Sequence, residues 1–194
     1  MARRSTWRAI FPAALVCLTT TSGADTSPPP ALHGPAPNFA LTTQQNDRLW
    51  LTQLRGRAVV LGFGCAACGA CPEIVPRLSA IARGLDDAPG RRVFFALVTL
   101  DPDRDSPAAL REFGRARGLR APAWLFLTED RAGQVEAVTR RYGVTVRRTG
   151  ERVEADCAVT LIDGDGRIRG RYDLGALGEL DRDLRSLLGL PVSP

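Results

Sequence analysis

Apolar and polar positions along the chain follow two patterns, one typical of buried strands and one typical of amphipathic helices. Short apolar runs predict strands of a core sheet at residues 58–63, 93–100, 124–127, 158–162 and 167–172. Apolar residues at helical spacing predict helices at residues 72–85, 106–116, 132–142 and 177–188. Two further apolar segments, at residues 39–41 and 49–51, are separated by polar residues and predict a hairpin ahead of the first core strand.

The order of these elements indicates the fold class. Strands alternate with helices through most of the chain, and two strands joined by the turn Asp163–Gly166 precede the last helix. This is the order of an α/β protein with a thioredoxin-like fold, in which helices flank a central mixed sheet. We therefore expect one thioredoxin-like domain over residues 39–190, with the N-terminal hairpin as part of it.

The N-terminus has the pattern of a secretory signal peptide. Arg3, Arg4 and Arg8 precede a short apolar stretch, which is followed by small and polar residues ending at Ala24. We expect a signal over residues 1–24 and export to the periplasm or the outer face of the cytoplasmic membrane. The apolar stretch is shorter than the ~20 residues that span a bilayer, although an uncleaved N-terminal anchor stays open. Lipidation at Cys17 is disfavoured, because Val16 stands where a lipoprotein signal needs a small residue.

The composition adds little to this picture outside the N-terminus. Residues 25–38 are rich in proline and predict an extended linker between the signal and the domain. The chain has 26 basic residues, all of them arginines, and 21 acidic residues, and the two kinds are interspersed. A basic stripe that would bind nucleic acid is therefore not indicated, and we expect no nucleic-acid partner.

Candidate chemistry is concentrated in the segment "GFGCAACGACPEIVP", residues 62–76. Cys65, Cys68 and Cys71 lie between the first core strand and the next helix, and thiols of an exported protein are usually in disulfides or kept for redox or metal chemistry. Cys68 and Cys71 have the C-x-x-C spacing that lets two thiols form a disulfide at a helix start. The partial positive charge of a helix N-terminus favours the thiolate, and Pro72 suits the first turn of that helix.

Two families resemble the chain in different segments. The run "VVLGFGCAACGACPEIVP" is similar to the active-site segment of TlpA-type periplasmic thioredoxins, with Cys68 and Cys71 in the C-x-x-C places. Most of the remaining chain resembles the SCO/SenC family, in the segments "LDPDRDSPAALREFGRARG" (100–118) and "LIDGDGRIRGRYD" (161–173). The resemblance to SCO/SenC implies a thioredoxin-fold copper protein that serves the assembly of cytochrome c oxidase.

The chain departs from the SCO/SenC pattern at the metal ligands. Where the family has C-x-x-x-C-P, Cys71 supplies the second cysteine but Ala67 holds the place of the first, and the place of the histidine ligand falls at Ala155. Cys157 stands two residues further on, where a TlpA-type thioredoxin has a cis-proline beside its dithiol. We expect Cys157 to approach Cys68 and Cys71, because residues two apart on a strand share a face.

Two main functions follow from these residues, and both remain open. In the first, Cys68, Cys71 and Cys157 bind Cu(I), with Cys65 as a further candidate, and pass it to the copper-site subunit of a respiratory oxidase or to another thiol or copper protein. Soft sulfur ligands select Cu(I), and Zn(II) is a possible competitor. In the second, the chain is a thiol–disulfide oxidoreductase in which Cys68 attacks a partner disulfide and Cys71 resolves the mixed disulfide. A family member that has lost the metal and acts as a sensor or scaffold is a third possibility.

Overall fold

The computed structural model describes residues 33–66, 69–129, 133–150 and 152–191. The predicted signal peptide, most of the predicted linker and Cys68 lie outside these ranges, so the predictions made for them stay predictions.

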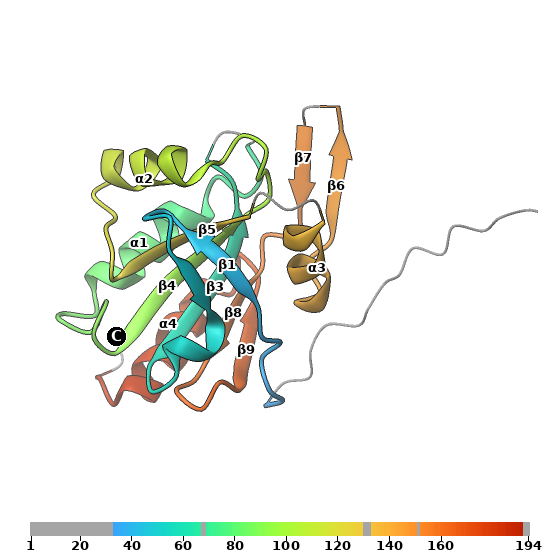
Figure 1. Ribbon diagram of the computed structural model, residues 1–194. Coiled ribbons are helices and arrows are strands. Elements are labelled where there is room, and N and C mark those ends of the chain that lie inside the picture. The colour runs from blue at the N-terminus through green and yellow to red at the C-terminus, as the bar shows by residue number, and fades with distance from the viewer. Residues whose placement is uncertain (1–32, 67–68, 130–132, 151, 192–194) are drawn as a thin grey trace, which may run out of the picture.

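A seven-stranded mixed sheet forms the centre of the molecule (Figure 1). Its strands are β1 (Ala40–Thr43), β2 (Arg48–Trp50), β3 (Ala58–Gly64), β4 (Val93–Thr99), β5 (Trp124–Thr128), β8 (Val159–Ile162) and β9 (Ile168–Tyr172). They lie in the order β2-β1-β5-β4-β3-β8-β9. Strands β3, β4 and β5 are parallel, because a helix connects each to the next, and the outer strands pair antiparallel.

Helices cover both faces of this sheet. They are α1 (Ile74–Arg83), α2 (Pro107–Ala116), α3 (Gln134–Arg141) and α4 (Leu177–Leu188). The apolar faces of α1, α2 and α4 pack with one side of the central strands in one core, whereas α3 packs with the other side in a second core. Neighbouring residues of β3 therefore serve different cores: Val60 belongs to the first, and Val59 and Leu61 belong to the second.

The predicted thioredoxin-like architecture is confirmed, and every predicted strand and helix is present with its ends shifted by at most a few residues. The start of α2 shows why such predictions succeed. The Ser106 side chain accepts a hydrogen bond from the Ala109 amide at 3.2 Å, and Pro107 takes the first helical position, where no donor is needed.

Three local features differ from expectation. A two-stranded sheet of β6 (Val146–Thr149) and β7 (Arg152–Ala155) was not predicted, and neither was the short 3-10 helix η1 (Leu51–Leu54). Figure 1 shows the β6–β7 hairpin projecting beyond the central sheet. Helix α1 begins at Ile74, so Pro72 precedes the helix instead of occupying its first turn.

The end of the predicted linker already contacts the domain. The His33 amide donates to the Ile168 carbonyl at 2.6 Å, and the Ala36 amide donates to the Gly166 carbonyl at 2.9 Å. The Tyr142 hydroxyl donates to the Pro37 carbonyl at 2.8 Å. These hydrogen bonds hold residues 33–38 on the domain, so its contacts start earlier than the predicted boundary at residue 39.

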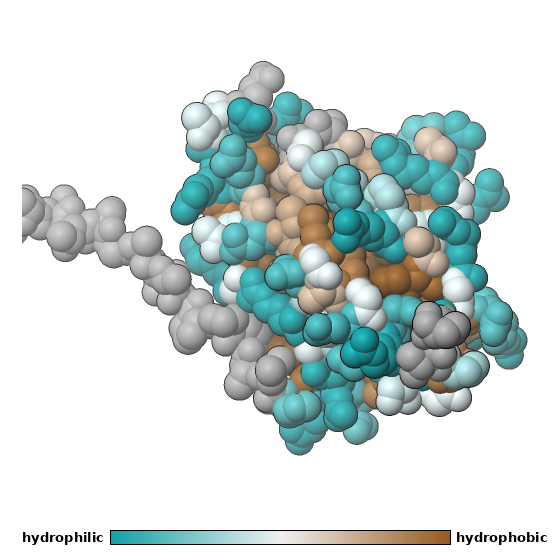
Figure 2. All heavy atoms as spheres, turned by 180° about the vertical axis from the view of Figure 1, so that it is seen from behind, coloured by the Kyte–Doolittle hydropathy of each residue, from teal (hydrophilic) through white to brown (hydrophobic). Residues whose placement is uncertain are grey.

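The surface is largely hydrophilic. Figure 2 shows the face opposite to that of Figure 1, where teal side chains surround a smaller group of apolar ones. Within the described ranges, the helices are too short or too polar for any of them to cross a membrane.

Candidate functional site

The cysteines lie where the strand order brings two distant segments together. Strands β3 and β8 are antiparallel neighbours, with Gly62 opposite Val159. The carboxyl end of β3 therefore lies beside the amino end of β8. Cys71 follows β3 in the turn before α1, and Cys157 precedes β8, so the pairing of these two strands places both cysteines at one end of the sheet.

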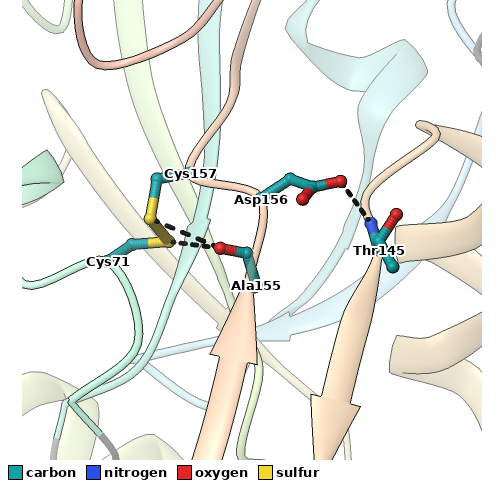
Figure 3. The surroundings of a disulfide bond; sticks show 5 residues. All are labelled: Cys71, Thr145, Ala155, Asp156 and Cys157. Atoms are coloured by element: carbon teal, nitrogen blue, oxygen red, sulfur yellow. Dashed lines mark hydrogen bonds between the residues drawn. A yellow bond between two sulfur atoms is a disulfide. The ribbon is translucent and has the colours of Figure 1, made fainter.

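Cys71 and Cys157 are joined by a disulfide (Figure 3). Their Cα atoms are 5.3 Å apart, although 86 residues separate them in the sequence. The expected approach of Cys157 to Cys71 is thus confirmed, but Cys71 pairs with Cys157 and not with Cys68 at the C-x-x-C spacing. The prediction for Cys68 itself lies outside the described residues.

The carbonyl oxygen of Ala155 lies beside both sulfurs. It is 3.9 Å from Cys71 Sγ and 3.6 Å from Cys157 Sγ, and Figure 3 shows it between the end of β7 and the disulfide. Ala155 is the position at which we expect the place of the SCO/SenC histidine ligand to fall. The structure places the backbone carbonyl of this residue next to the two cysteines.

The two sulfurs have different surroundings. Cys71 is 5% exposed and belongs to the core formed with α1 and α4. Its backbone adopts φ +54°, a left-handed conformation that costs about 1–2 kcal/mol for a residue with a side chain. Cys157 is only partly buried and packs against the edge of that core. The disulfide therefore joins a buried cysteine to a more exposed one.

A small cavity adjoins the cysteine segment on the side of α2. It has a volume of about 150 Å³, and Cys65 and Cys71 both line it, together with Phe113 and Arg117 of the α2 region. The Arg117 guanidinium lies 3.8 Å above the Phe113 ring, so a cation stands over the aromatic wall. Cys65 is partly buried and is itself disulfide-bonded. The predicted cysteine cluster thus includes Cys65 and Cys71 on one cavity.

A buried carboxylate anchors the start of the cysteine segment. Asp105 is 1% exposed, and its Oδ2 accepts hydrogen bonds from the Ala66 amide at 3.0 Å and from the Thr99 hydroxyl. Burial raises the pKa of the Asp105 carboxyl above its ordinary value, while these two hydrogen bonds act in the opposite direction. The loop that follows β4 is thereby tied to the residue after Cys65.

A second buried carboxylate, that of Asp101, lies in the same loop after β4. Asp101 is 3% exposed and pairs with the Arg104 guanidinium at 2.7 Å. The Asp101 amide donates to the Thr99 hydroxyl oxygen at 3.0 Å, so the chain Asp101–Thr99–Asp105 is linked through one hydroxyl. Sequence reasoning missed Asp105 and Thr99 as site residues. The available signal was a polar run placed directly after a buried strand, at the sheet end where parallel strands usually present their functional groups.

The described residues do not form a ready-made metal centre. Among them, no three histidine, cysteine, aspartate or glutamate side chains are grouped so as to hold a metal ion. Cys71 and Cys157 are bonded to each other, and a disulfide sulfur is not a thiolate ligand. Reduction of this bond would leave two thiols and one carbonyl oxygen at the same place.

Sequence and structure comparisons agree on the relatives of this chain. Residues 29–183 match the family described as SCO1/SenC. No curated protein matches the sequence closely enough to count as a relative. The fold is similar to that of a SCO1/SenC family lipoprotein from Bacillus anthracis, with a TM-score of 0.72 and 20% identity over 81% of this chain and 96% of that one.

Two further solved structures share the fold. Arabidopsis thaliana ScoI with copper bound has a TM-score of 0.68 and 20% identity over 79% of this chain and 98% of that one. BsSco, in which a disulfide switch was identified, is a member of the Sco family of cytochrome c oxidase assembly proteins. It has a TM-score of 0.69 and 21% identity over 82% of this chain and 96% of that one. At these identities the structures establish the shared fold, and the family match covers most of the sequence: the chain belongs to the SCO1/SenC family.

Proposed function

We propose that this chain binds Cu(I) through cysteine thiolates and delivers it during assembly of a respiratory oxidase. Cys71 and Cys157 supply the central pair of sulfurs, and Cys68 and Cys65 are the further candidates. The observation that carries the proposal is the meeting of Cys71 and Cys157 beside Ala155. This is the position at which we expect the family's histidine ligand to fall. Cys157 would then supply a third thiolate, beside those of Cys68 and Cys71, in place of the missing imidazole.

The chemistry of the site suits a soft, singly charged metal ion. Thiolates prefer Cu(I), and Zn(II) is the competitor that also accepts sulfur ligands. Copper is the cargo in this proposal, so the site must both hold and release it. The Cys71–Cys157 disulfide has to be reduced first, because its sulfurs carry no ligand charge while they are bonded to each other.

The structural relatives support the proposed copper acceptor and the proposed cellular location of this chain. Arabidopsis thaliana ScoI is known with copper bound, and BsSco belongs to a family of cytochrome c oxidase assembly proteins. By analogy, the acceptor is the copper-site subunit of an oxidase or another thiol or copper protein. One structural relative is a lipoprotein, which fits the export expected from residues 1–24 and a site in the periplasm or at the outer face of the cytoplasmic membrane.

Anaerobic titration of the reduced protein with Cu(I), in competition with a chelator of known affinity, tests this proposal. We expect tight binding of one equivalent, weakened about tenfold or more in Cys71→Ala and in Cys157→Ala. Cys65→Ala changes a further candidate ligand that shares a cavity with Cys71, and it should weaken binding less than either central variant. Unchanged affinity in both central variants would contradict the proposal.

The disulfide itself favours thiol–disulfide exchange as a second candidate function. A disulfide between a buried cysteine and a partly exposed one has the form of an exchangeable pair. The earlier prediction assigned attack to Cys68 and resolution to Cys71, and it remains a prediction because Cys68 lies outside the described residues. Catalytic reduction of a protein disulfide without Cu(I) binding would favour this function, and absence of both activities would favour a sensor or scaffold.

A further inference from the structure

We infer that the Cys71–Cys157 disulfide exchanges with a protein dithiol, and that the partner's thiolate attacks Cys157 while Cys71 leaves. This inference deepens the proposed function and rests on it, since the same two sulfurs must be reduced before they can bind Cu(I). It also assigns roles that differ from those of a C-x-x-C pair. The sulfur that meets the partner comes from the segment before β8, and the buried sulfur of the cysteine turn is the leaving group.

The difference in burial carries the assignment. Attack on a disulfide requires that the incoming thiolate reach a sulfur atom, so access decides which sulfur is attacked. Cys71 is 5% exposed and is enclosed by the core around Ile74 and Leu78 of α1. Cys157 is partly exposed and packs against that core without being one of its buried members.

Two hollows near the disulfide favour approach from the Cys157 segment: one is lined by Cys71, and the other is lined by Ala155 and Asp156, the residues just before Cys157. The cavity that Cys71 lines holds about 150 Å³, which is room for a few water molecules but not for a protein segment. A more open groove of about 250 Å³ lies at the base of the β6–β7 hairpin, directly before Cys157 in the chain. Its walls include Arg147, Glu154 and Asp156, so it suits a polar segment that flanks a partner's cysteine.

The exchange balances with a dithiol as the reductant. One partner thiol loses its proton to solvent, and its thiolate bonds to Cys157 Sγ while the Cys71–Cys157 bond breaks and Cys71 leaves as a thiolate. The partner's second thiol is deprotonated in turn and attacks the partner sulfur of the mixed disulfide, so Cys157 is released. The partner loses two electrons and two protons and becomes a disulfide, and both cysteines of this chain become thiols.

The Ala155 carbonyl can accept hydrogen bonds from the thiols that the exchange produces. Its oxygen lies 3.9 Å from Cys71 Sγ, so the Cys71 thiol formed by protonation has an acceptor at its present position. The same oxygen lies 3.6 Å from Cys157 Sγ, so it can accept from the second thiol as well. A backbone carbonyl thus keeps the two reduced sulfurs close together, ready to be oxidised again or to bind the metal.

A trapping experiment on metal-free protein tests the direction of attack. The probe is a thioredoxin whose resolving cysteine is replaced by serine, which stops the reaction at the mixed disulfide. It is mixed with the oxidised full chain carrying Cys65→Ser and Cys68→Ser, so that the bond between Cys71 and Cys157 is the one available. Tryptic mapping then separates Cys71, in the peptide of residues 58–77, from Cys157, in the peptide of residues 153–167.

We expect the thioredoxin on Cys157, in about tenfold excess or more over Cys71. Adducts mainly on Cys71, or no adduct at all, would overturn the inference. If the double variant does not fold, the wild-type chain is used and the modified cysteine is identified by fragmentation of the trapped peptide. A Cu(I) titration of the same reduced protein keeps the two proposals apart: tight binding alongside adducts on Cys71 would refute the inference and leave the copper proposal standing.

Discussion

Position 155 lies at the centre of the site at the scale of single residues. Its carbonyl oxygen is within 3.9 Å of both sulfurs, so its backbone lies next to them. We predict that Ala155→His raises the Cu(I) affinity of the reduced protein by about tenfold or more, because imidazole adds a nitrogen ligand to the two thiolates. Competitive titration with a Cu(I) chelator measures the change.

The control for this substitution is the neighbouring residue on the same strand. Glu154 is exposed, and successive residues of a strand point to opposite faces, so Glu154→His adds the same imidazole on the other side of β7. Its affinity should stay close to that of the wild type. An equal gain in Cu(I) affinity in both variants would show that the effect of the imidazole does not depend on its position. That result would contradict our placement of the site at Ala155.

Near the cysteines, the fold shifts the pKa of the Asp105 carboxyl. Burial raises the pKa of its carboxyl, so the folded protein binds a proton there more tightly than the unfolded chain does. The resulting stabilisation is complete below the ordinary carboxyl pKa of about 4, and it is lost as pH rises through the raised value.

Asp105→Asn should remove this pH dependence, because the amide is neutral throughout and its oxygen can still accept from the Ala66 amide. We predict that the free energy of unfolding of the variant increases relative to that of the wild type as pH rises from about 4 to 7. Urea unfolding at a series of pH values measures the difference. A difference that stays constant or shrinks with pH would contradict the role given to burial.

At the scale of elements, helix α2 approaches the sheet closely at one glycine. A Cβ added at Gly114 would lie 2.7 Å from the Leu119 carbonyl oxygen and 2.7 Å from the Phe126 ring. We predict that Gly114→Ala destabilises the protein by about 1–3 kcal/mol despite the better helix propensity of alanine, because the backbone or the ring must move. Urea unfolding of the variant against the wild type measures the loss.

Gly178 offers the matched substitution in α4. It is exposed, and a Cβ there would meet nothing within 4 Å. Gly178 is the second residue of α4, so Gly178→Ala should stabilise the protein through helix propensity by less than the ~0.5–1 kcal/mol of a helix interior. If both glycine variants changed stability in the same direction, close packing of α2 on β5 would not be the cause.

The elements also show how far sequence reasoning reaches. Apolar runs and helical spacing predicted the strands and helices of the central domain, because each buries a continuous apolar face in one of the two cores. The β6–β7 hairpin was missed because it does not bury a continuous apolar face. Its residues are mostly exposed: β6 buries none of its residues, and the alternation in β7 covers four residues with Val153 as the buried one, which is too short a pattern to mark a strand.

The cysteine pairing shows a different limit. Spacing along the chain favours a bond between Cys68 and Cys71, since local pairs are the ones that a sequence reveals. The observed partner of Cys71 is Cys157, and their meeting depends on β3 and β8 lying side by side, which is a property of the whole sheet. Asp105 was missed because its importance comes from burial against Ala66 and Thr99, and burial is decided by tertiary packing.

At the scale of the whole molecule, the disulfide closes a loop that contains much of the domain. The 86-residue separation spans β4, β5 and the β6–β7 hairpin, so the bond removes a large amount of freedom from the unfolded chain. We predict that replacing both Cys71 and Cys157 by alanine lowers the free energy of unfolding by about 2–5 kcal/mol.

Urea unfolding of the oxidised wild type and of the double variant measures this loss. Both are then unfolded again in the presence of a reductant, where their stabilities should become similar. A double variant as stable as the oxidised wild type would mean that the bond contributes nothing to the stability of the domain.

The account depends most directly on the bond between Cys71 and Cys157, and disulfide mapping of the unreduced protein tests it. Trypsin releases Cys65, Cys68 and Cys71 on the peptide of residues 58–77 and Cys157 on that of residues 153–167. We predict that mass spectrometry finds the two peptides joined, with fragmentation placing the link at Cys71, and that reduction separates them. A peptide of residues 153–167 that carries a free thiol, beside a Cys68–Cys71 bond within the other peptide, would contradict the account.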